Sequence, residues 1–149
     1  MAAPTKAQLA TARDFLDRAD RRISGAAKAA LRSNTDQGEF DNNFDGVVTA
    51  IFHAIDAFEL ATTGIKRRVG EAEQRTRIES VLASLRAART PKVPPESRLT
   101  ELNRRRNTSV HGEWEEVLDQ DALEDAIHAA RELVAAVRHY LKAKGIEGF

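Results

Sequence analysis

The spacing of apolar residues is the feature that most constrains how this chain can fold. Along most of its 149 residues, apolar side chains recur at intervals of three and four, and no stretch has the pattern of a strand. Such spacing places the apolar side chains on one face of a helix. It predicts an all-α fold, an up-and-down bundle of four or five helices. The length corresponds to one domain, so residues 1–149 are expected to form a single helical domain.

Glycine, proline and polar segments separate the expected helices. A capping box at Thr5 to Gln8 begins the first, and the segment between Ser33 and Asn43 is polar and predicted to be a loop. Gly64 is expected to end the second helix, which has the widest apolar stripe. The five expected helices cover approximately residues 6–31, 44–63, 78–85, 97–110 and 121–144.

Composition limits the class of protein. Lys and Arg together number 23, as do Asp and Glu, so the net charge of the whole chain does not indicate a nucleic-acid-binding protein. The chain has no cysteine and therefore no disulfide or thiolate site. Because no apolar run is long enough for a signal peptide or a membrane span, we expect a cytoplasmic protein without membrane contact.

The predicted helix 97–110 carries a polar cluster on the border of its apolar face. Three apolar residues define that face: Leu99, Leu102 and Val110. Arg106 falls in the middle of the same face, and Asn103, Asn107 and His111 follow one another at i, i+4 and i+8 along its edge. Since a buried guanidinium needs a partner, Arg106 is expected to face an anionic group.

These side chains suit the cleavage of RNA without a metal ion. The imidazole of His111 can act as base or acid near neutral pH. The guanidinium of Arg106 can hold a phosphate through two parallel hydrogen bonds, and Asn107 can orient the imidazole or donate to a phosphate oxygen. No pattern of metal ligands and no glycine-rich phosphate loop is present, so no metal and no cofactor is expected.

The stretch Arg106-Asn107-Thr108-Ser109-Val110-His111 resembles the motif of the HEPN family, which is Arg, a polar residue (often Asn), three further residues and His near the end of a late helix. Members of this family are small helical bundles. The resemblance implies a metal-independent endoribonuclease in which Arg106, Asn107 and His111 are catalytic. It also implies a homodimer with both motifs in one cleft. Many members are toxins that pair with a nucleotidyltransferase antitoxin, or belong to phage-defence systems.

Further residues of the motif helix are expected to contact the RNA backbone. They are Arg98, Asn103, Arg104 and Arg105. An earlier basic stretch runs from Lys66 to Lys92 and includes Arg75 and Arg77, and it is interpreted as a solvent-exposed face. The three other histidines are interpreted as surface or helix-flank residues rather than ligands: His53, His128 and His139.

The chain departs from one toxin branch of the family. In that branch a tyrosine that the partner modifies with AMP stands two residues after the histidine, where this chain has Glu113, so regulation of that kind is not expected. The main alternative is a non-catalytic interaction or dimerisation module, in which Arg106 pairs with Glu113 or Asp56 and His111 caps a helix end. An antitoxin-like or immunity-type binding protein is a third interpretation.

Overall fold

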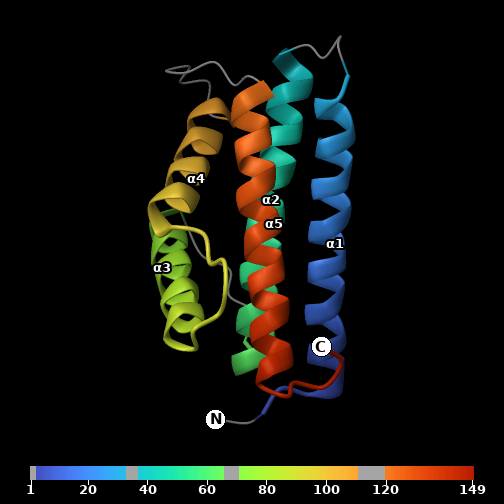
Figure 1. Cartoon of the computed structure of the whole chain (residues 1–149), viewed down its shortest axis with the longest axis vertical. Coiled ribbons are helices and arrows are strands. Elements are labelled where there is room, and N and C mark those ends of the chain that lie inside the picture. Colours follow the sequence, from blue (N-terminus) through green and yellow to red (C-terminus); the bar gives the residue numbers. More distant parts are fainter. Residues whose placement is uncertain (1–2, 33–36, 66–70, 111–119) are drawn as a thin grey trace.

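The computed structural model describes residues 3–32, 37–65, 71–110 and 120–149. Five helices occupy most of these ranges: α1 (Lys6–Ala30), α2 (Gln37–Thr63), α3 (Glu71–Ala87), α4 (Glu96–Val110) and α5 (Gln120–Ala143) (Figure 1). The described ranges contain no strand. The predicted all-α bundle is therefore confirmed. No helix within these ranges is long and apolar enough to cross a membrane.

Helices α1, α2 and α5 form the main core of the bundle (Figure 1). The apolar stripe predicted for α2 is buried along its whole length, from Phe44 to Phe58. Alanines such as Ala12 and Ala19 on α1 are fully buried, and their small side chains let the helices approach closely. The 3.6-residue periodicity of the sequence thus translates directly into the buried face of each helix.

Polar contacts fix the ends of α1 and α2 against each other. The backbone N–H of Gln8 donates to the hydroxyl of Thr5 at 3.1 Å, and the Gln8 side chain accepts from the Thr5 backbone at 2.8 Å, so the predicted capping box is confirmed. The amide nitrogen of the same Gln8 side chain donates to the carbonyl of Gly64 at 2.8 Å. Gly64 has a φ of 72° and follows the last residue of α2. The beginning of α1 is thereby tied to the end of α2.

Helices α3 and α4 lie one after the other along the side of the bundle away from α1 (Figure 1). They contain 17 and 15 residues, against 27 in α2, so each covers only part of the length of α2. Figure 1 shows that α3 runs in the same direction as α2, which departs from the predicted up-and-down order. Contacts explain this direction: Arg77, near the start of α3, binds Asp56 and Glu59, whereas Ser84, further along, lines a cavity together with Thr62.

The predicted loop between Ser33 and Asn43 is shorter than the sequence indicated. Residues 37–43 belong to α2, which begins at Gln37. Phe40 is partly buried against the core, and Glu39 lies in the first turn, where a negative charge favours a helix. The polar composition of residues 37–43 therefore concealed about two turns of helix.

Candidate functional site

The second half of α4 brings the motif residues against the first half of α2. Leu99 and Leu102 are 1% and 2% exposed and anchor α4 in the core. Arg106 and Asn107 follow about one turn later, and both are half-buried. His111, Glu113 and the side chain of Val110 lie outside the described residues, as does the predicted contact between Arg106 and Glu113.

Three of the described residues contact the guanidinium of Arg106: Asp45, Phe52 and Asn103. Its guanidinium lies 5.3 Å from the centre of the Phe52 ring, and one terminal nitrogen donates to the side-chain oxygen of Asn103 at 3.2 Å. Its Nε lies 3.9 Å from a carboxylate oxygen of Asp45, which is the anionic partner that the sequence analysis expected without identifying it. The Arg106 side chain is 20% exposed and that of Asp45 is 49% exposed, so water reaches this ion pair and weakens it.

Asn103 is a positioning residue in this arrangement. It is 8% exposed, and it is one of the few buried polar residues in the described part of the chain. Its carbonyl oxygen accepts from Arg106 one turn later on the same helix. Because a buried amide without a hydrogen-bond partner is destabilising, the burial of Asn103 favours its hydrogen bond to Arg106. Asn103 was expected to contact RNA, whereas its described contact orients the guanidinium.

The other arginines of α4 contact different groups. The guanidinium of Arg105 lies 5.9 Å from the centre of the Phe44 ring. Arg104 donates two hydrogen bonds to Glu101, at 2.9 and 2.6 Å. Arg98 forms an ion pair with Asp125 at the start of α5. Arg98 is also two turns away from Arg106, so the expected RNA-binding residues do not form one cluster.

The pair of Arg104 and Glu101 is weak and exposed. The hydrogen bonds from Arg104 hold the pKa of Glu101 below its ordinary value. Because the pKa of Glu101 is lower in the folded chain than in the unfolded chain, its ionised form stabilises the folded state at pH values above the unfolded pKa. This contribution is lost as the pH falls through the pKa of the folded state. Because both side chains are about half exposed, the contribution is small.

The interpretation of the basic stretch from Lys66 to Lys92 is wrong for Arg77. This side chain is only 6% exposed, and it donates to Glu59 at 2.7 Å and to Asp56 at 2.5 Å. Burial lowers the pKa of Arg77, but the hydrogen bonds and charges of Glu59 and Asp56 outweigh burial, and the net pKa lies above its ordinary value. Asp56 is therefore the partner of Arg77 and not of Arg106, which corrects the pairing considered above.

Sequence reasoning missed this network, although a signal for it exists. Arg77, Val81 and Leu85 stand at i, i+4 and i+8, so helical periodicity places Arg77 on the buried face of α3. The same reasoning had selected Arg106 on α4. Asp45 and Phe52 could not be found in this way, because the sequence does not reveal which part of α2 faces α4.

The described histidines outside the motif behave as flank residues. His53 stacks on Phe15 of α1, with ring centres 5.6 Å apart, and His128 on the exposed side of α5 lies 3.1 Å from Glu132. No group of three or more His, Asp or Glu among the described side chains is arranged to hold a metal ion.

Comparison with models of protein families, with curated proteins and with solved structures found no match to this chain. The motif residues and their contacts are therefore the basis for a functional assignment.

Proposed function

We propose that this chain is a HEPN-like, metal-independent endoribonuclease in which Arg106, Asn107 and His111 act on RNA. The arrangement of Arg106 supports the proposal most strongly. Phe52 and Asn103 fix its guanidinium at the border of the core, while its ion pair with Asp45 is long and open to water. An oriented guanidinium can hold a phosphate through two parallel hydrogen bonds, and the described ion pair with Asp45 is weak enough to be exchanged for one.

In the proposed reaction, an imidazole of His111 takes the proton of a ribose 2′-hydroxyl. The 2′-oxygen attacks the adjacent phosphorus, and the bond to the 5′-oxygen of the next nucleotide breaks, with an acid returning a proton to that oxygen. Arg106 neutralises the charge that develops on the phosphate oxygens. The products are a 2′,3′-cyclic phosphate end and a 5′-hydroxyl end, and no metal or cofactor takes part.

The experiment that tests this proposal uses one RNA oligonucleotide and its analogue with a 2′-deoxy nucleotide at the cleavage position. The purified protein should cleave the RNA in the presence of EDTA and leave a 2′,3′-cyclic phosphate that mass spectrometry identifies. It should leave the deoxy analogue intact, because the attacking hydroxyl is missing. Cleavage of both substrates, or activity that EDTA abolishes and magnesium restores, would contradict the proposal.

The proposed reaction also favours a homodimer. One copy of the motif supplies a single histidine, whereas the reaction needs both an acid and a base. A two-fold interface pairs a surface patch with itself, so two copies of the α4 edge that carries Asn107 would bring two His111 together. We therefore propose one composite cleft with two Arg106 and two His111.

Subunit mixing tests the composite cleft. Protomers with His111→Ala are mixed in increasing excess with wild-type protomers, refolded together, and assayed at constant wild-type concentration. A shared cleft predicts that the activity per wild-type subunit falls as mixed dimers form. Constant activity per wild-type subunit, together with a monomer on a calibrated sizing column, would show that each site is complete in one protomer.

A non-catalytic interaction module is the second candidate, and one observation favours it. Arg98 and Arg104, both expected to bind RNA, form ion pairs with Asp125 and Glu101 instead. In that case α4 would present a surface of paired charges to a partner protein, and the chain would act as an interaction module or an antitoxin-like binding protein. Absence of cleavage by the wild-type dimer on all RNA substrates would favour this candidate. If the chain is instead an active toxin, an antitoxin or nucleotidyltransferase would be the partner.

A further inference from the structure

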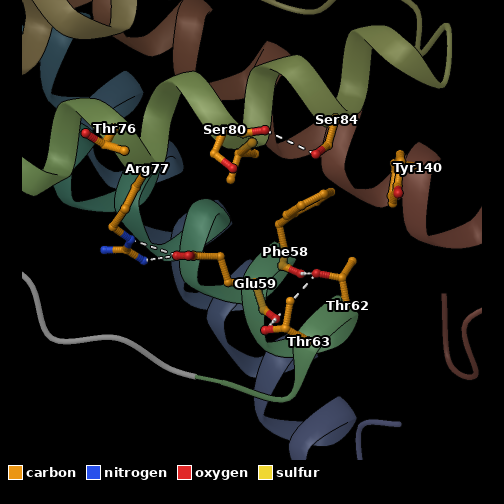
Figure 2. A pocket seen from close by; sticks show the side chains of 10 residues that line it. Phe58, Glu59, Thr62, Thr63, Thr76, Arg77, Ser80, Ser84 and Tyr140 are labelled. Carbon is orange, nitrogen blue, oxygen red and sulfur yellow. Dashed lines mark hydrogen bonds and ion pairs between the residues drawn. The ribbon is translucent and has the colours of Figure 1, made fainter. Parts of the chain in front are cut away.

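A polar cavity of about 290 Å³ lies between α2, α3 and α5 (Figure 2). Its walls come from the second half of α2, including Phe58 and Thr62, from Ser84 on α3 and from Tyr140 on α5. Arg106 contacts the first half of α2, so this cavity is separate from the motif residues. Its volume is close to the lower limit for small-molecule sites and suits a ligand of a few heavy atoms.

Hydroxyl groups in the cavity wall are set to accept hydrogen bonds. The hydroxyl of Thr62 donates to the backbone carbonyl of Phe58 at 2.7 Å, and that of Ser84 donates to the carbonyl of Ser80 at 3.1 Å (Figure 2). A hydroxyl has only one hydrogen to donate, so both oxygens offer only lone pairs to a ligand. A ligand that binds these two hydroxyls must therefore bring the hydrogen-bond donors.

The charged end of the cavity also favours a donor. Arg77 faces two carboxylates, Asp56 and Glu59, which leaves one excess negative charge among these three side chains. Both of the hydrogen bonds from Arg77 to Glu59 end on the same oxygen, Oε1. No described group donates to the second oxygen of Glu59, which remains an acceptor for a ligand. Figure 2 shows Glu59 and Arg77 at one end of the cavity.

Two aromatic rings complete the wall. Phe58 and Tyr140 have ring centres 5.0 Å apart and are tilted by 53°. Aromatic faces attract cations. The ammonium group of Lys144 already lies 5.5 Å from the centre of the Tyr140 ring, so a primary ammonium fits beside this residue. Lys144 itself is exposed, and water and salt screen its charge from the cavity.

From the acceptor hydroxyls, the excess carboxylate and the aromatic wall, we propose that this cavity binds a small organic cation with a primary ammonium group, such as a short aliphatic diamine. In a diamine, one ammonium would donate to Glu59 and the other to the hydroxyl of Thr62 or Ser84, and the alkyl chain would lie against Phe58 and Tyr140. This proposal does not depend on ribonuclease activity.

The test follows the ring signals of Tyr140 by NMR in the full chain, since this is the single tyrosine. The probes are 1,4-diaminobutane, 1-aminobutane and the neutral isostere 1,4-butanediol. Both amines should shift the Tyr140 signals in a saturable manner, and the diol should not. Equal shifts with the diol, or no shift with either amine, would overturn the proposal.

Three variants locate the binding site. Glu59→Gln keeps an acceptor for Arg77 but removes the excess charge, so it should weaken the binding of 1,4-diaminobutane about tenfold or more. Glu79→Gln, an equal change of charge on the exposed side of α3, should leave binding unchanged. Ser84→Val leaves the ion pairs intact, removes one acceptor and places a larger side chain in the cavity, so it should also weaken binding. It provides the test if Glu59→Gln does not fold. An equal effect of Glu79→Gln, or tight binding by Ser84→Val, would overturn the proposal.

Discussion

Replacement of Arg106 by Ala is expected to slow RNA cleavage by about a hundredfold or more, because it removes a preorganised positive charge from the proposed phosphate site. Arg106→Lys should recover only part of the rate, since lysine keeps the charge but cannot form two parallel hydrogen bonds. Single-turnover cleavage of one labelled RNA, with the protein in excess of both the RNA and the dissociation constant, measures the effect on the chemical step.

A matched control separates this effect from a general loss of charge. Arg22→Ala removes one exposed positive charge from α1, which lies on the other side of α2 and α5 from α4 (Figure 1). It should leave the cleavage rate unchanged. Circular dichroism should show that Arg106→Ala remains helical, although loss of the donor to buried Asn103 is expected to cost about 1–3 kcal/mol of stability. A wild-type rate in folded Arg106→Ala would remove this residue from the site.

The second large effect concerns stability. Arg77→Ala is expected to lower the free energy of unfolding by about 3–5 kcal/mol, because it leaves the carboxylates of Asp56 and Glu59 close together and largely buried without their counter-ion. Urea denaturation followed by helicity measures this change. This loss is a large fraction of the total free energy of unfolding of a typical domain, which is about 5–15 kcal/mol.

Arg75→Ala is the appropriate comparison for Arg77→Ala. Arg75 lies two residues earlier on α3, its side chain is 69% exposed, and it pairs with Glu79 on the surface. Its replacement should cost less than about 1 kcal/mol. If the two variants lost equal stability, the buried ion pairs of Arg77 with Asp56 and Glu59 would not stabilise the packing of α3 on α2 more than a surface pair does.

Local patterns predicted the parts of the fold that depend on local interactions. The buried stripe from Phe44 to Phe58, the capping box at Thr5 and the helix end at Gly64 follow from residues near one another in sequence. The direction of α3 does not, because it depends on the contact of Arg77 with Asp56, 21 residues away in the sequence. Patterns along one helix cannot show which surface of another helix it meets.

For the candidate site too, the sequence predicted the features of one helix but not its contacts with another helix. Periodicity placed Arg106 in the middle of an apolar face, where the structure leaves its side chain 20% exposed, and it required an anionic neighbour for this residue. It could not identify Asp45 or Phe52 as neighbours, since these residues come from α2. It also misplaced Asn103, which is buried and bonded to Arg106, because an asparagine at a helix edge has the same spacing whether it faces solvent or a neighbouring side chain.

The most direct test of the proposed function is the rate of RNA cleavage by His111→Ala, measured in EDTA beside wild-type protein prepared in parallel. The ribonuclease proposal predicts no cleavage above the buffer background, because His111 is the one residue of the six-residue motif whose side chain exchanges a proton near neutral pH. Helicity and melting temperature should match the wild type, since His111 is predicted at the edge of the apolar face rather than within it. Cleavage by His111→Ala at the wild-type rate would contradict the assignment of this chain as a HEPN-like ribonuclease.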